Sequence, residues 1–310
     1  MLGVAYVAYW VLSLFSGLFW PPVMAWLTGG LNDKELNREI SIFNRSWMAS
    51  NIVGPLIAGS LYRWNSMMAF VVLCLSYSMV TILLFLMRRY SKEHGTEAEI
   101  ELPVISTTPD SAPEPVKSQK LKAIDRKLDL FRYRSWVSAF CSAMFMGVLV
   151  NITPIHIRDG LGYTERAAGM ILFFRCVMGF TGFTLLARFT AWQFSRRWFL
   201  ILHGMLIFCA FLLLFAGSRF PLFFVVVFIY GLINSGTYNG SIFYSGATGR
   251  NPKKNLALHE IFLCIGNAIG TAGGGFIYQQ FRYAGMALAL IMILSLGLGA
   301  SILLERRQDQ

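Results

Sequence analysis

Residues 51–62 read Asn-Ile-Val-Gly-Pro-Leu-Ile-Ala-Gly-Ser-Leu-Tyr, and residues 267–278 repeat the pattern as Asn-Ala-Ile-Gly-Thr-Ala-Gly-Gly-Gly-Phe-Ile-Tyr. Asparagine, glycine and tyrosine recur at the same spacing in both copies. Each copy lies in an apolar stretch of the kind that crosses membranes. A parallel repeat of membrane segments is typical of proteins built from two similar helical halves.

The composition predicts an all-α, polytopic membrane protein, because 55% of the residues are hydrophobic and only 14% are charged. Charge-free runs reach roughly the 20 residues that a spanning helix needs. They are residues 2–31, 64–87, 135–157, 198–218, 220–249 and 283–304. The runs 46–62, 167–187 and 256–281 are shorter or are interrupted by charges. We therefore expect about nine transmembrane helices.

The net charge of +11 follows the topology of these runs. If the loops alternate between the two sides of the membrane, one side carries 21 basic residues and the other five. This positive-inside bias predicts that the first side, with the central loop and the C-terminus, is cytoplasmic. We expect a bilayer of the bacterial inner (plasma) membrane type, with no nucleic-acid partner.

The chain lacks the residue clusters of several other functional classes. All five cysteines fall in the expected spans without a CxxC spacing, and the four histidines are scattered, so we expect no metal site and no cofactor. A phosphate-binding G-x-x-x-x-G-K-[ST] loop is missing, which disfavours an ATP-driven pump. No catalytic constellation lies in a span, so we do not expect an enzyme.

A polar segment, residues 89–133, separates three expected spans in residues 1–88 from six in residues 134–310. Its prolines and basic residues predict a cytoplasmic central linker. In the second half, about 133 residues precede the repeated pattern, whereas in the first half only 50 do. The difference is roughly three spans. We therefore expect the first half to lack three helices of a twelve-helix ancestor.

Two helical halves, a basic central loop and glycine motifs in matching helices resemble the major facilitator superfamily. Its fifth helix often carries G-P-x-x-G-G, which residues 54–59, Gly-Pro-Leu-Ile-Ala-Gly, resemble. Residues 270–275, Gly-Thr-Ala-Gly-Gly-Gly, match without the proline. The family's cytoplasmic G-x-x-x-D-R-x-G-R-R motif is matched only in part by residues 182–197, where Ala187 occupies the position of the acidic residue.

The resemblance implies a secondary transporter that moves a small solute by alternating access. Two alternatives remain: a non-transporting membrane scaffold or sensor, and an inactive truncated transporter. Loss of three helices favours both alternatives, because half of the usual cavity wall is then absent.

Small residues of the repeat are candidates for helix packing and flexing. Glycines spaced along one face let helix backbones approach closely, and a proline removes a backbone hydrogen bond. The candidates are Gly54, Pro55, Gly59, Gly270, Gly274 and Gly275.

Arg175 lies near the middle of an expected span. A lone arginine at mid-membrane costs about 2.5–3.5 kcal/mol on insertion scales, so its side chain should face a cavity or a partner. It either binds an anionic group of a substrate or pairs with Glu260. Uncharged candidates for the same cavity are Asn151, Asn234, Tyr238 and Asn239, which could instead form hydrogen bonds between helices.

His259 and Glu260 open an expected helix after a basic turn. Because burial disfavours a charged carboxylate, Glu260 could exchange a proton and couple transport to a proton gradient. The alternative is a gate or cap, since an acid near a helix N-terminus is favoured by the helix dipole. Arg188, Arg196 and Arg197 are further gating candidates, with the acidic Asp33, Glu35 and Glu39 as partners. The tryptophans Trp10, Trp20 and Trp26 fit interface or lipid contact, and Asn267 fits packing.

Overall fold

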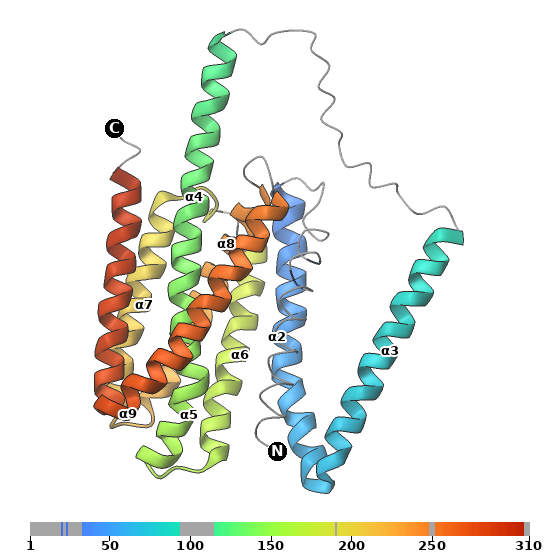
Figure 1. The fold of residues 1–310 in the computed structure, drawn as a ribbon, viewed down its shortest axis with the longest axis vertical. Helices are drawn as coiled ribbons and strands as arrows, with labels where there is room; N and C mark the ends of the chain where they lie inside the picture. Colours follow the sequence, from blue (N-terminus) through green and yellow to red (C-terminus); the bar gives the residue numbers. More distant parts are fainter. Residues whose placement is uncertain are drawn as a thin grey trace. The chain divides into compact units, whose positions relative to one another are not determined.

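In the computed structural model, the described residues are 33–93, 115–189, 191–247 and 252–306, together with Trp20 and Val23. They form helices and no strand, which confirms the all-α fold class. The long helices (Figure 1) are α2 (Asp33–Trp64), α3 (Ser66–Glu93), α4 (Pro115–Gly147), α6 (Glu165–Arg188), α7 (Arg196–Ala216), α8 (Leu222–Ala247) and α9 (Pro252–Arg306). Three short segments join α4 to α6: η1 (Val148–Ile152), α5 (Thr153–Ile155) and η2 (His156–Gly160).

These helices account for the expected spans from residue 46 onward. The expected span at residues 2–31 lies outside the described residues except for Trp20 and Val23, so the count of nine stays a prediction. In the described part of the chain, five helices are long and apolar enough to cross a membrane. One of them, Lys254–Leu303, contains two expected spans. The chain is therefore an integral membrane protein.

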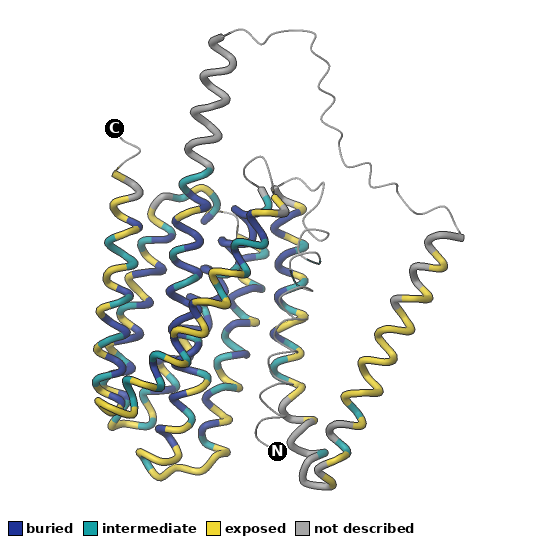
Figure 2. Tube along the Cα trace, viewed as in Figure 1, coloured by how far each residue is buried: buried dark blue, intermediate teal, exposed yellow. Residues whose placement is uncertain are grey.

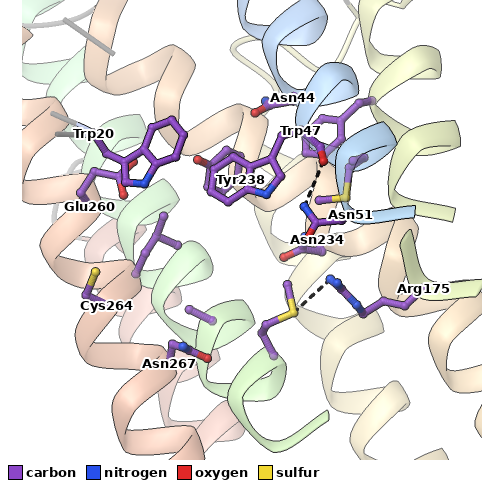
Figure 3. Close-up of a pocket in the computed structure, with 15 residues that line it drawn as sticks. Trp20, Asn44, Trp47, Asn51, Arg175, Asn234, Tyr238, Glu260, Cys264 and Asn267 are labelled. Atoms are coloured by element: carbon purple, nitrogen blue, oxygen red, sulfur yellow. Dashed lines mark hydrogen bonds between the residues drawn. The ribbon is translucent and has the colours of Figure 1, made fainter. Parts of the chain in front are cut away.

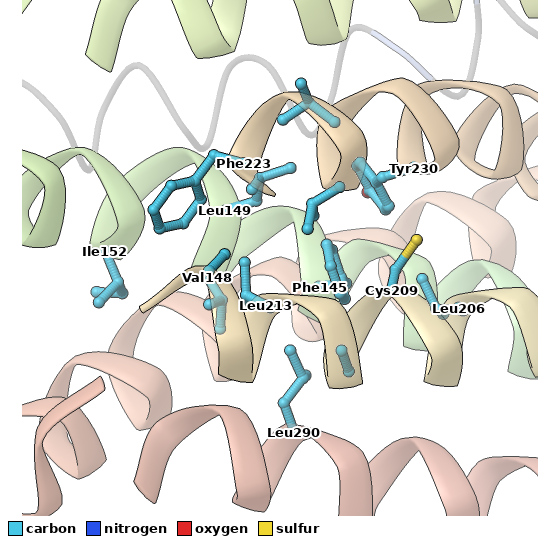
Figure 4. Close-up of a cluster of buried hydrophobic side chains, with 14 of the residues drawn as sticks. Phe145, Val148, Leu149, Ile152, Leu206, Cys209, Leu213, Phe223, Tyr230 and Leu290 are labelled. Carbon is cyan, nitrogen blue, oxygen red and sulfur yellow. The ribbon is translucent and has the colours of Figure 1, made fainter. Parts of the chain in front are cut away.

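Contacts divide the chain into two compact units. The larger unit contains the residues up to Asn51 and those from Leu121 onward. Within it α6 packs along α8, and α7 contacts both α8 and α9. Its apolar core (Figure 4) joins α4, η1, α7, α8 and α9 through Phe145, Leu149, Leu206, Leu213, Phe223, Tyr230 and Leu290. Phe145 stacks on Tyr230 with 4.7 Å between ring centroids.

The smaller unit runs from Ile52 to Lys120 and contains all of α3. Asn65 ends α2 and starts α3, because its Oδ1 accepts a hydrogen bond from the backbone N–H of Met67 at 2.9 Å. Large apolar side chains such as Leu75 and Phe85 are exposed on α3. Figure 2 colours most of the described part of this helix as exposed. A helix that is apolar on its exposed faces suits lipid rather than water.

The last helix folds back on itself at Arg282. Figure 1 shows α9 as two arms that run in opposite directions. The arms meet where Arg282 has φ 60° and ψ −172°. A positive φ is uncommon for a residue with a side chain. The expected basic turn between residues 256–281 and 283–304 is thus a break at a single residue.

Glycines let α9 approach α4 backbone to backbone. A Cβ at Gly270 would overlap the carbonyl oxygen of Met144. A Cβ at Gly266 would lie 2.6 Å from the carbonyl oxygen of Phe140. On the α4 side, a Cβ at Gly147 would crowd the backbone of α9 in the same way. The crossing therefore requires glycine on both helices.

Candidate functional site

A cavity of about 410 Å³ opens in the larger unit between α2, α4, α6, α8 and α9. Its polar wall (Figure 3) consists of Asn44, Asn51, Arg175, Asn234, Tyr238, Glu260, Cys264 and Asn267. Its apolar wall includes Trp20, Trp47, Met146 and Phe183. A concave site of a few hundred Å³ with a small number of polar groups suits a small molecule.

Arg175 brings a positive charge to this cavity from α6. Its Nη1 lies 3.2 Å from Met146 Sδ, and its Nη2 lies 3.1 Å from Cys176 Sγ. Sulfur is a weak acceptor, and Arg175 Nε has no hydrogen-bond partner. Among the described residues no carboxylate forms a salt bridge with Arg175, so the pairing with Glu260 that the sequence left open is not formed here. The guanidinium is free to bind an anion.

Asn234 reaches the cavity from α8 with its amide orientation set by two hydroxyl groups. Ser142 Oγ donates to Asn234 Oδ1 at 3.2 Å. The Tyr230 hydroxyl lies 3.3 Å from the same oxygen. Because the oxygen accepts these contacts, the amide nitrogen is the group that Asn234 offers to a ligand.

Asn44 on α2 offers a second amide donor. The residue is 1% exposed and lines the cavity, and its Nδ2 has no hydrogen-bond partner among the residues that the structure describes. An unsatisfied buried donor is unfavourable, and native proteins contain few of them. A ligand acceptor in the cavity would satisfy it.

Glu260 brings a carboxylate to the same cavity from α9. Its Oε1 lies 3.8 Å from His259 Nε2, beyond hydrogen-bond distance. His259 is fully buried, and its Nδ1 is paired with Ser241 Oγ at 2.7 Å. The two neighbours therefore face different surroundings, as residues about 100° apart on a helix must. Glu260 lines the cavity and His259 packs against α8.

Aromatic rings form the wall beside these groups. Trp20 and Trp47 stack with 5.0 Å between centroids and planes 8° apart. Tyr238 meets Trp47 edge to face at 6.3 Å. All three rings line the cavity.

Two of the candidate polar residues lie elsewhere. Asn151 donates to the Gly147 carbonyl and to Thr271 Oγ1, at 3.0 and 2.9 Å, and is not part of the cavity wall. Asn239 is fully buried and donates to Asn37 Oδ1 at 3.2 Å. Both residues make the hydrogen bonds between helical segments that the sequence offered as the alternative.

The three arginine gating candidates belong to the ends of α6 and α7 and are not part of the cavity wall. Arg188 and Arg197 are exposed, and Arg196 is the first residue of α7. Where α2 meets α6, Asn37 Nδ2 donates to the carbonyl of Leu186 at 3.2 Å. This amide contact, rather than an ion pair of Arg188, joins the two helices among the described residues.

The glycine candidates differ between the two copies of the repeat. In the second copy, a Cβ at Gly274 would lie 2.9 Å from Val148 Cγ2, and one at Gly275 would be 3.4 Å from Ile152 Cδ1. In the first copy, a Cβ at Gly54 would meet no described atom within 4 Å. Pro55 and Gly59 continue α2 without interruption.

The cavity also contains residues that the sequence did not single out as ligands. Asn51 and Asn267 are the first residues of the two copies of the repeat, and both line the cavity. Trp20, expected at the interface or against lipid, lines it as well. Equivalent positions in a two-fold repeated protein face the same central space. The matching positions of Asn51 and Asn267 in the two copies could therefore have predicted that both line the cavity.

Comparison with known protein families gives one match that covers most of the chain. The model of the Major Facilitator Superfamily matches residues 2–254. The chain belongs to the major facilitator superfamily. No curated protein matches the chain by sequence.

The fold of this chain is similar to that of solved structures. One of them is the crystal structure of a bacterial homologue of the iron transporter ferroportin in an outward-facing state. The two are 18% identical with a TM-score of 0.56, and the match covers 88% of this chain and 66% of that one. The present chain therefore spans just under two thirds of the length of the ferroportin homologue. At this identity the likeness concerns the fold alone.

Proposed function

We propose that this chain is a secondary transporter that moves a small solute bearing an anionic group by alternating access, and is not an enzyme. The observation that carries the proposal is Arg175, a guanidinium on a cavity wall with only sulfur contacts. Asn234 and Asn44 add amide donors to the same cavity. Positive charge plus neutral donors is the chemistry that recognises carboxylates and phosphates.

The membrane and the driving force belong to the same proposal. The positive-inside bias supports a bacterial inner membrane with the central loop and the C-terminus in the cytoplasm. Glu260, which borders the cavity beside His259, is the candidate for coupling to protons or another ion. Arg188, Arg196 and Arg197 remain candidates for a cytoplasmic gate.

Efflux of a mixture of candidate solutes from liposomes tests the proposal. Liposomes containing the purified protein are loaded with equimolar small carboxylates, organic phosphates, amino acids, amines and sugars, and each compound's loss is followed by mass spectrometry. We expect selective loss of a class that carries an anionic group. Arg175→Gln should slow that loss about tenfold or more, because a charge-assisted hydrogen bond contributes about 1.5–3 kcal/mol.

Arg166→Gln is the matched control, because Arg166 is an exposed arginine on the same helix, outside the cavity wall. It removes the same charge and should leave efflux unchanged. Selective efflux of neutral sugars, or equal efflux by wild type and Arg175→Gln, contradicts the proposal.

A further inference from the structure

We propose that the solute is a zwitterion, whose anionic group binds Arg175 and whose amine or quaternary ammonium group binds Glu260 and the aromatic wall. This inference rests on the proposed transport function and names the chemical class of the solute.

Among the described lining residues, Arg175 carries a positive charge and Glu260 a negative one, and neither has a close partner in that part of the chain. Within the described ranges, the Arg175 guanidinium has two sulfur atoms as its polar partners, and Glu260 Oε1 lies 3.8 Å from His259 Nε2. Only 16% of the Glu260 side chain is exposed. A charge in such surroundings is costly unless it is paired. A ligand with both charges would pair the two groups at once.

The two charges lie in separate parts of the cavity. Arg175 extends from α6 and Glu260 from α9, so the two charges come from different helices of the cavity wall. Figure 3 shows Glu260 and Arg175 on opposite sides of the group of lining residues. This separation leaves space for a molecule between them, which a direct salt bridge would not.

The part of the cavity that contains Glu260 suits a cation. Stacked Trp20 and Trp47, with Tyr238 edge-on to Trp47, present electron-rich rings to the same space. Aromatic faces attract ammonium groups, and indole rings attract them most. The part that contains Arg175 suits an anion, since the Asn234 amide nitrogen is a donor in the same wall.

A solute with only one charge would pair with one of the two charged residues and leave the other unpaired. A carboxylate would leave Glu260 unpaired, and an amine would leave Arg175 unpaired. An uncompensated buried charge is strongly unfavourable. The cavity should therefore bind an amino acid or betaine more tightly than the corresponding carboxylate or amine. The best spacing between the two ligand charges is set by the separation of Arg175 and Glu260.

A ligand series measures this preference on the purified full chain in lipid nanodiscs. The probes are γ-aminobutyrate, ε-aminocaproate and its trimethylammonium analogue, with caproate and hexylamine as partners that each lack one charge. Equilibrium binding is followed by calorimetry and by the ligand-induced rise in melting temperature. We expect the affinity of at least one zwitterion to exceed the affinities of caproate and hexylamine by about tenfold or more.

Variants assign the two charges. Glu260→Gln should reduce the affinity for the zwitterion to that for caproate, and Arg175→Gln should reduce it to that for hexylamine. Arg166→Gln should change neither affinity. If an Arg175→Gln or Glu260→Gln protein does not fold, Arg175→Lys and Glu260→Asp keep the charge and should shift the preferred ligand length instead.

The outcomes separate this inference from the proposed function. If caproate binds as tightly as the zwitterions and Arg175→Gln abolishes that binding, the zwitterion is refuted and anion transport stands. If only hexylamine binds, or if no probe binds and the efflux assay shows no anionic solute, both are refuted.

Discussion

Two asparagines on α2 differ in whether their side-chain amides have hydrogen-bond partners. Asn37 donates to the Leu186 carbonyl and accepts from Asn239, so both ends of its amide are used. Asn44, two turns further along the helix, is equally buried, but its Nδ2 has no partner. A buried polar group without a partner costs about 1–3 kcal/mol. Asn37 therefore stabilises the fold, and Asn44 is suited to bind the solute.

Replacing each asparagine by leucine tests that difference. Asn37→Leu should lower the free energy of unfolding by about 1–3 kcal/mol, because it leaves the Leu186 carbonyl and the Asn239 amide unpaired. Asn44→Leu should leave the melting temperature unchanged or raise it, since no hydrogen bond is lost. It should also weaken ligand binding in the calorimetric assay. A fall in melting temperature as large as that of Asn37→Leu contradicts the assignment.

At the scale of single residues, the sequence predicted part of the candidate site. Polar residues inside apolar runs identified Arg175, Asn234, Tyr238 and Glu260, and all four line the cavity. The same signal selected Asn151 and Asn239, because polarity alone does not tell a cavity from a helix contact. Asn44 was missed for a physical reason. The charge of Arg45 ended the apolar run, yet α2 starts at Asp33 and carries Asn44 into the cavity wall.

At the scale of elements, the crossing of α4 and α9 brings two cavity walls together. The wall residues Ala143 and Met146 on α4 lie beside Gly147, and Asn267 on α9 lies beside Gly266 and Gly270. Close backbone contact fixes the register between these helices. The sequence predicted glycine packing in this copy of the repeat. The partner helix could not be predicted, because it depends on the tertiary arrangement.

Alanine substitutions along α9 test the crossing. Gly270→Ala places a methyl group against the Met144 carbonyl and should destabilise the protein by about 1–3 kcal/mol. Gly273→Ala, three residues further, is the control, since a Cβ there meets only its own helix at 3.9 Å. Thermal unfolding in nanodiscs measures both variants. Equal melting temperatures for the two would show that the helices are not in backbone contact.

At the scale of the whole molecule, hydropathy predicted most of the helices in the described part. In a bilayer every backbone polar group must be paired within its own segment, so long apolar runs become helices. The two antiparallel arms of α9 were predicted as separate spans, and the break falls at Arg282 as expected. Hydropathy does not determine which residues face one another across the bundle. The cavity therefore became visible only in three dimensions.

We propose that the charged cavity inside the membrane domain is accessible to water. Cys264 is a native reporter, because it is exposed on the cavity wall one helical turn from Glu260. Cys141, Cys176 and Cys209 are buried, and Cys74, the other exposed thiol, can be removed as Cys74→Ser.

The most direct measurement is therefore the rate at which membrane-impermeant methanethiosulfonate reagents modify Cys264 in Cys74→Ser liposomes, with the modified site assigned by mass spectrometry. We predict that Cys264 reacts, and that a cationic reagent modifies it faster than an anionic one. Glu260→Gln should remove this preference for the cationic reagent. A bound zwitterion should slow the modification. Modification by membrane-permeant reagents alone would place Cys264 and Glu260 against lipid and contradict the account.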